Sequence, residues 1–244
     1  MSTTTTLWPF FIPTTLSVAP ILVALAAGAI ALGTDTAEGA CTAPSTAELA
    51  FVSGAGSAAR VKRTVAPDGS EVLHGETELS LGEKTRRCIV EDVSLDAQGR
   101  LARADVAVAA WCGAEPESRA HLDPERGRAT WSTRSATSEV TATSSLPWIY
   151  TPELLPGIPA TTPIAAWVAS RAAALSPSLA LLQLERRRAW RVPRDQVVVA
   201  TERGATVVLG NDGADVSAGF VERVHLGDCG VTLVRVPRAD EPLI

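Results

Sequence analysis

Beyond residue 48, apolar and polar residues alternate along much of the chain, and a period of two is typical of half-buried β-strands. The alternation is clearest between Leu73 and Leu81, where leucine and threonine occupy one side of the strand and His74, Glu76 and Glu78 occupy the other. Comparable patterns predict strands over residues 61–65, 86–95, 101–111, 128–143, 179–191, 196–201, 205–209, 217–226 and 231–236.

Segments rich in Gly, Pro and Asp separate these strands. In Ala66–Gly69 a proline presets φ and a glycine accepts a positive φ, which is the chemistry of a tight turn. Asp96–Gly99 stands between residues 86–95 and 101–111 and predicts a hairpin that joins them. The chain is therefore expected to form an antiparallel sheet from neighbouring hairpins.

One segment has helical rather than strand periodicity. Thr162 is a good N-cap, Pro163 suits the first helical position, and Ser176 followed by Pro177 ends the pattern. Ile164, Trp167, Val168, Ala172 and Leu175 recur at spacings of three and four and predict the buried face. The preceding stretch, residues 147–161, contains four prolines and is expected to be an ordered loop or lid that could separate two lobes.

These elements predict a β-dominated α+β fold, an antiparallel sheet or half-barrel with one central helix, preceded by an apolar signal or anchor helix. The expected organisation is a leader over residues 1–39, a linker over 40–48 and a single exported domain over 49–244. By architecture alone, such a domain is similar to periplasmic carriers that shelter an apolar ligand.

The leader contains seventeen consecutive residues without a charge, Leu16–Leu32. This length lies between a signal h-region and a membrane-spanning helix. Ala37 and Gly39 fit signal peptidase cleavage before Ala40, and cleavage before Thr34 is the alternative. Residues 1–15 contain no Lys or Arg, so retention as a membrane anchor stays open. Either way, the domain is expected outside the cytoplasmic membrane, in the periplasm, in the cell envelope or secreted.

Charge excludes one class of partner. The formal net charge of the chain is −5, and the leader contributes Asp35 and Glu38, which leaves −3 for the remainder. Because non-specific nucleic-acid binding requires a basic face, nucleic acid is not an expected partner.

The four cysteines, Cys41, Cys88, Cys112 and Cys229, are disulfide candidates in an oxidising compartment. Cys88 and Cys112 flank the hairpin at Asp96–Gly99. A hairpin register that pairs Leu95 with residue 100 sets Cys88 opposite Ala107, five residues short of Cys112, unless a bulge intervenes. The sequence leaves all three pairings of the four cysteines open.

No motif in the sequence specifies a reaction, and we predict no cofactor, metal ligand or catalytic residue. His74, His121 and His225 lie on separate predicted strands without metal-binding spacing. The sequence lacks a GxSxG motif, and the Gly54–Ala59 segment lacks the helix that a nucleotide-binding loop requires.

The densest charge cluster, residues 185–191, is the candidate binding segment. On one strand, Arg186, Arg188 and Trp190 would share a face, and guanidinium groups beside an indole can bind anionic headgroups, glycans or carboxylates. The alternative is a solvated edge strand that its charges protect from further pairing.

We therefore expect a non-enzymatic envelope or periplasmic binding protein for an apolar or anionic small ligand, with the membrane as a further partner if the leader is retained. A secreted hydrolase with a site of scattered residues and a structural, membrane-tethered envelope protein are the alternatives. An apolar pocket without titratable groups would favour the first. A Ser or Asp within hydrogen-bond reach of His74, His121 or His225 would favour the hydrolase.

Overall fold

The computed structural model describes residues 43–82, 85–141, 145–152, 161–176, 178–183, 188–191, 198–201, 204–209, 212–217 and 219–237. The chain divides between Ala40 and Cys41 into two units, and every described residue belongs to the second. The leader and its expected cleavage sites lie outside the described residues. No helix within the described ranges has the length and apolarity needed to span a membrane.

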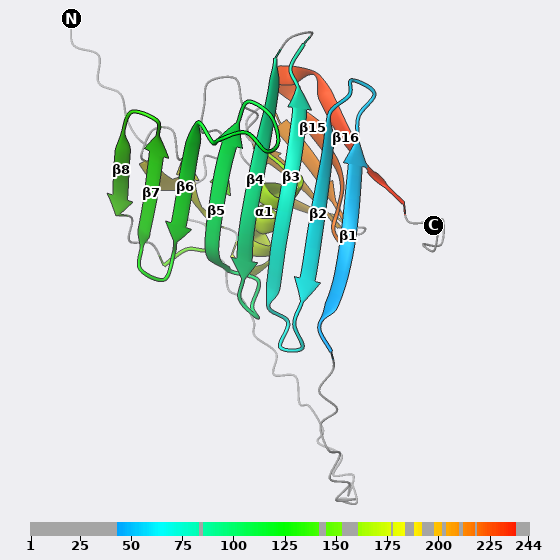
Figure 1. Cartoon of the computed structure of the whole chain (residues 1–244). Helices are drawn as coiled ribbons and strands as arrows, with labels where there is room; N and C mark the ends of the chain where they lie inside the picture. The colour runs from blue at the N-terminus through cyan, green and yellow to red at the C-terminus, as the bar shows by residue number, and fades with distance from the viewer. Residues whose placement is uncertain are drawn as a thin grey trace, which may run out of the picture. The chain divides into compact units, whose positions relative to one another are not determined.

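An antiparallel sheet of 13 strands forms most of the structure, in the order β12-β13-β14-β15-β16-β1-β2-β3-β4-β5-β6-β7-β8 (Figure 1). Residues 45–141 supply β1 (Ser45–Val52), β2 (Ala58–Val65), β3 (Glu71–Ser80), β4 (Arg86–Leu95), β5 (Leu101–Ala109), β6 (Ser118–Asp123), β7 (Arg128–Thr133) and β8 (Thr137–Thr141). The second half supplies β12 (Val198–Thr201), β13 (Gly204–Leu209), β14 (Asp212–Val216), β15 (Val221–Leu226) and β16 (Val231–Val236), with a short 3-10 helix η1 (Gly227–Cys229) before β16.

Neighbouring strands of this sheet are neighbours in sequence except at one place. There β1 pairs with β16 and aligns Phe51 with Arg235. The first described strand therefore lies inside the sheet, between β16 and β2. It also begins at Ser45, so the last four residues of the expected linker belong to a strand.

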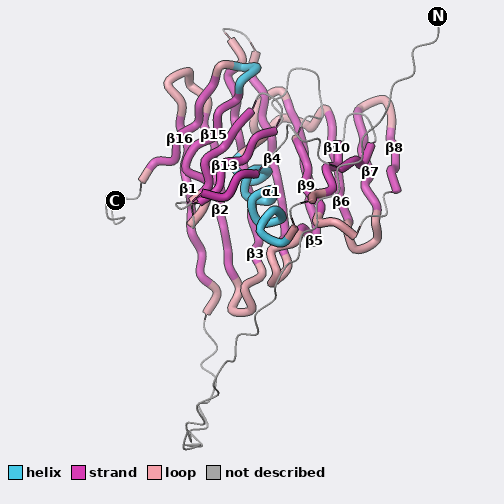
Figure 2. The backbone as a smooth tube through the Cα atoms, turned by 180° about the vertical axis from the view of Figure 1, so that it is seen from behind, coloured by secondary structure: helices cyan, strands magenta, loops and turns pink. Residues whose placement is uncertain are grey.

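The helix α1 (Pro163–Leu175) covers one face of the sheet, as Figure 2 shows from behind. Its sequence signals act as predicted: Pro163 occupies the first turn, and Thr162 Oγ1 accepts a hydrogen bond from the amide of Ala165 at 3.1 Å. We call the side of the sheet toward α1 the buried face and the opposite side the exposed face. The fold is thus β-dominated with one α-helix in the described part.

The buried face carries the apolar residues of the alternating pattern, among them Leu73 and Leu79 of β3 and Val93 and Leu95 of β4. From the helix, Ile164, Trp167 and Val168 are buried in the same core, as the periodicity predicts, whereas Leu175 is exposed. Gly75 of β3 permits the close approach, because a Cβ atom there would lie 2.6 Å from Cδ1 of Ile164.

A second, three-stranded sheet contains β9 (Trp148–Thr151), β10 (Ala180–Gln183) and β11 (Arg188–Arg191). β10 pairs in parallel with β9 and antiparallel with β11. The single strand predicted over residues 179–191 is therefore wrong. Its two ends pair with each other as β10 and β11, because alternation alone does not reveal where a strand reverses.

Cys88 and Cys112 form a disulfide, with Cα atoms 5.0 Å apart. The exception that the sequence analysis allowed is the one that occurs: a bulge between Ser94 and Leu95 shifts the β4–β5 pairing, so that Cys88 faces Ala109 rather than Ala107. The chain bends after β5 and returns Cys112 to Cys88. The disulfide indicates an oxidising environment outside the cytoplasm.

Candidate functional site

The candidate site lies on the exposed face, where polar residues from successive strands stand in one cross-strand row. The backbone register aligns the following residues, from β1 to β6: Glu48, Lys62, His74, Asp92, Asp105 and His121. Directly opposed residues on neighbouring strands are about 5 Å apart and can interact. The strand alternation explains why all six share the face opposite α1.

Two histidine–aspartate pairs occupy the centre of this row. Nδ1 of His74 lies 2.7 Å from Oδ1 of Asp92, and Nδ1 of His121 lies 2.7 Å from Oδ1 of Asp105. The two aspartates are themselves opposite each other on β4 and β5. Each carboxylate fixes the orientation of its imidazole.

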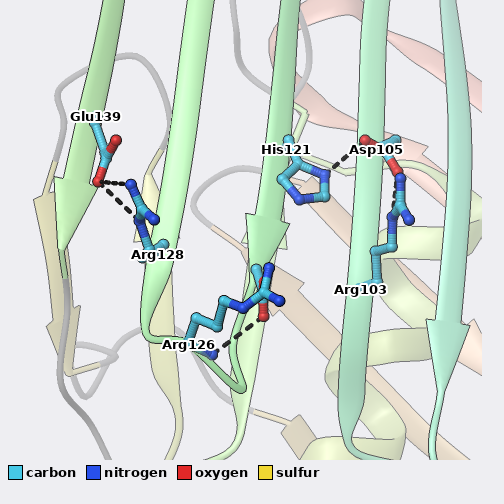
Figure 3. A network of polar contacts seen from close by, with 7 residues as sticks. Arg103, Asp105, His121, Arg126, Arg128 and Glu139 are labelled. Carbon is cyan, nitrogen blue, oxygen red and sulfur yellow. Dashed lines mark hydrogen bonds and ion pairs between the residues drawn. The ribbon is translucent and has the colours of Figure 1, made fainter.

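Figure 3 shows the β5–β6 end of the row, where Asp105 also accepts a hydrogen bond from Nε of Arg103 at 2.7 Å. Further along, Arg128 on β7 donates two hydrogen bonds to Oε1 of Glu139 on β8. The arginines labelled in Figure 3 are neutralised by carboxylates, and such exposed pairs contribute little to stability.

A groove of about 600 Å³ opens at the other end of the row, across β1, β2 and β3. Its described lining residues are Glu48, Leu49, Ala50, Arg60, Val61, Lys62, His74 and Glu76. Arg60 and Lys62 stand two residues apart on the same face of β2. Unlike the arginines of Figure 3, neither forms an ion pair with another described residue.

The groove therefore contains two basic groups that are not paired with a described carboxylate, beside the imidazole of His74. The carboxylates of Glu48 and Glu76 lie on the flanking strands, opposite Lys62 and Arg60 respectively. A compact anion is thus favoured at the centre of the groove, over β2, and disfavoured at its rims.

The buried face contains a second polar cluster, around Glu91 of β4. Its Oε1 accepts hydrogen bonds from the Tyr150 hydroxyl at 2.7 Å and from Oγ1 of Thr162 at 2.8 Å, while its buried Oε2 has no hydrogen-bond partner among the described residues. Burial raises the pKa of Glu91 to about 7, against the two hydrogen bonds, which lower it. Burial and the Glu91 charge together raise the pKa of Tyr150 well above its usual value.

Glu71 of β3 is a second buried carboxylate on this face. Its Oε2 accepts hydrogen bonds from Nε of Arg63 at 2.8 Å and from Nε1 of Trp167 at 3.0 Å. The Arg171 guanidinium approaches Oε1 at 3.7 Å. These contacts compensate the buried charge and fasten α1 to the sheet. We assign this cluster a structural role.

The residues singled out from the sequence do not converge on the groove. Arg186 lies outside the described residues, and Arg188 and Trp190 lie on β11, opposite Gln183 and Leu181 of β10. Cys41 also lies outside the described residues. Cys229 is half-buried in η1, and His225 on β15 places Nδ1 3.0 Å from Oγ1 of Thr232.

Sequence reasoning missed the row because His74 and Asp92 are far apart in the chain, and only the hairpin register aligns them. It also passed over Glu91, although Ile89, Val93 and Leu95 on the same side of the predicted strand mark that position as buried. A carboxylate on an otherwise apolar strand face was the available signal.

Within the described ranges, no group of three or more His, Cys, Asp or Glu residues is placed so that it could hold a metal ion. The chain matches no protein-family model, no curated protein and no solved structure.

Proposed function

We propose that this protein is an exported binding protein that holds a small anionic ligand in the groove across β1, β2 and β3. The observation that carries the proposal is the pair Arg60 and Lys62, two basic side chains that form no ion pair with another described residue and that line a groove of about 600 Å³. That volume is in the range of small-molecule sites. Arg103, on the exposed face of β5, is instead paired with Asp105.

Export is supported by the apolar leader together with the Cys88–Cys112 disulfide. N-terminal sequencing of protein recovered from the envelope or medium tests it. A chain that begins at Ala40 or Thr34 supports cleavage, whereas an intact Met1 in the membrane fraction supports an anchor. Intact soluble protein in the cytoplasm would contradict export.

Binding can be tested with 1-anilinonaphthalene-8-sulfonate, a fluorescent aromatic anion. Its affinity should fall at least tenfold in the double variant Arg60→Gln/Lys62→Gln, and it should weaken as salt is added. Arg119→Gln is the matched control, because Arg119 is also exposed on this face, on β6, and forms no ion pair with a described residue. Equal affinity in all three proteins would contradict the proposed site.

A secreted hydrolase is the second candidate. The pairs His74–Asp92 and His121–Asp105 meet the criterion given for it in the sequence analysis, whereas the groove, lined by Lys62, His74 and Glu76 among others, is not the apolar pocket without titratable groups expected of a binding protein. Nucleophilic catalysis also requires a hydroxyl or thiol within reach of the imidazole. No such group is hydrogen-bonded to either histidine in the described part of the chain. Hydrolysis of p-nitrophenyl butyrate that disappears in His74→Gln would establish this second function.

A further inference from the structure

The groove continues into an uncovered apolar strip on the exposed face. The strip consists of Ala50 and Val52 on β1 and Val234 and Val236 on β16. Ala50 pairs with Val236, and Val52 pairs with Val234, so the four side chains form a block two residues long and two strands wide. Val52 remains 50% exposed, and Val234 and Val236 are each 43% exposed.

This strip is contiguous with the basic groups of the groove. Ala50 lines the groove and faces Arg60 across the β1–β2 pairing. On the outer side, Arg223 of β15 faces Val234 of β16. An apolar surface thus lies between arginines on its two flanks. Lys62 follows Arg60 on the same face of β2, and on β3 Glu76 faces Arg60 while His74 faces Lys62. A ligand that covers both regions needs an anionic head and an apolar tail.

We infer that the ligand is a single-chain amphipathic carboxylate, a long-chain fatty acid anion, whose headgroup lies on Arg60 and Lys62 and whose chain lies along the strip. This inference rests on the proposed anion-binding groove. This occupant complements both parts of the surface. The strip alone would suit any apolar partner, but it adjoins the basic side chains of Arg60 and Lys62, so a chain that ends in an anion fits best. Covering the strip removes apolar surface from water and favours binding with each methylene of the chain.

Isothermal titration with three soluble probes tests the inference: dodecanoate, hexanoate and dodecyltrimethylammonium. Dodecanoate should bind at least tenfold more tightly than hexanoate, because the shorter chain leaves the strip uncovered. Dodecyltrimethylammonium should not bind measurably, since its chain is long but its headgroup is positive. Equal affinities for dodecanoate and hexanoate would overturn the inference and leave the anion groove intact, and binding of neither carboxylate would overturn both.

The variants locate the two parts of the ligand. Val52→Thr/Val234→Thr should weaken dodecanoate several-fold and leave hexanoate unchanged, while Arg60→Gln/Lys62→Gln should weaken both. Val72→Thr is the matched control, because Val72 is an exposed β3 valine outside the strip and its replacement should change neither affinity. If sedimentation shows a dimer that Val52→Thr/Val234→Thr dissociates and dodecanoate does not, a second copy covers the strip and the inference is wrong.

Discussion

The indole of Trp167 donates a hydrogen bond from Nε1 to Oε2 of Glu71 over 3.0 Å, and both side chains are buried between α1 and β3. The same carboxylate oxygen accepts a hydrogen bond from Arg63, whose guanidinium carbon lies 4.8 Å from the centroid of the indole ring. Carboxylate, guanidinium and indole therefore form one unit that fixes the helix on the sheet.

Replacing Trp167 by Phe should destabilise the protein by about 2 kcal/mol, because a hydrogen bond to a buried charged group is lost while most of the ring volume remains. Trp167→Ala should cost about 3–5 kcal/mol through the additional cavity. Urea unfolding of both variants measures these losses. Trp111→Phe is the control, since Trp111 is 61% exposed and should change stability by less than about 0.5 kcal/mol. A Trp167→Phe variant as stable as this control would show that the bond contributes nothing.

Gly75→Ala should destabilise the protein by about 1–3 kcal/mol, because the new Cβ atom would lie 2.6 Å from Cδ1 of the buried Ile164. Ile164→Val removes that Cδ1 atom and alone should cost about 1 kcal/mol. The double variant should be more stable than the sum of the two losses predicts, because the overlap is relieved. Strictly additive losses in thermal unfolding would mean that the two residues do not contact each other as described.

Removing the disulfide with Cys88→Ala/Cys112→Ala should lower the free energy of unfolding by about 3 kcal/mol, because the bond closes a loop with a sequence separation of 24. Reductant should destabilise the wild type by a similar amount and leave the double variant unchanged. Thiol titration of the native protein under denaturing, non-reducing conditions is the direct check. Four reactive thiols in protein taken from its native compartment would refute the bond.

Glu91 should make the protein less stable as pH rises. The folded-state pKa is about 7 and the reference value is 4.5, so the folded state holds the proton more tightly than the unfolded state. The resulting stabilisation is complete below about pH 4.5 and is lost as pH rises through about 7, on the order of 3 kcal/mol in all. Glu91→Gln, which cannot titrate, should lack this loss.

Urea unfolding of wild type and Glu91→Gln at pH 5 and pH 8 measures the difference. At pH 8 the free energy of unfolding of Glu91→Gln should rise relative to that of the wild type. Tyr150→Phe removes one hydrogen bond to Glu91 and should raise the carboxyl pKa further. This variant should therefore lose more stability between pH 5 and pH 8 than the wild type does. Parallel stability profiles for wild type and Glu91→Gln would show that Glu91 does not exchange its proton in this range.

Local signals predicted the parts of the fold that depend on a few neighbouring residues. Thr162 and Pro163 specify where α1 begins, and Gly69 and Gly99 have positive φ in the turns that the sequence predicts. The register between β4 and β5 could not be predicted in this way, because the bulge between Ser94 and Leu95 depends on contacts across the sheet rather than on local composition. For the same reason, the row that joins His74 to Asp92 was not predictable from spacing.

The basic residues of the groove could not be recognised from the sequence for the same reason: the neighbours of a side chain across a sheet do not appear in its local sequence. Arg60 and Lys62 are ordinary strand residues in the sequence, and their availability follows only from what the neighbouring strands place around them. Conversely, the charge cluster at residues 185–191 attracted attention as a dense run, yet its described part is the short strand β11 in the second sheet. Charge density along the chain and charge availability in space are different properties.

The pairing of β1 with β16 has a consequence for how the sheet forms. All other pairings in the 13-stranded sheet join strands that are adjacent in sequence. The strands β1–β8 and the strands β12–β16 can therefore each pair through local hairpins. Joining the two blocks requires closure of nearly the whole described chain, which is the entropically slow step. Until β16 pairs with it, the edge of β1 that carries Ala50 and Val52 has unpaired backbone groups and can pair with another strand. While a ribosome or translocation channel still holds β16, the blocks β1–β8 and β12–β16 cannot join into one sheet.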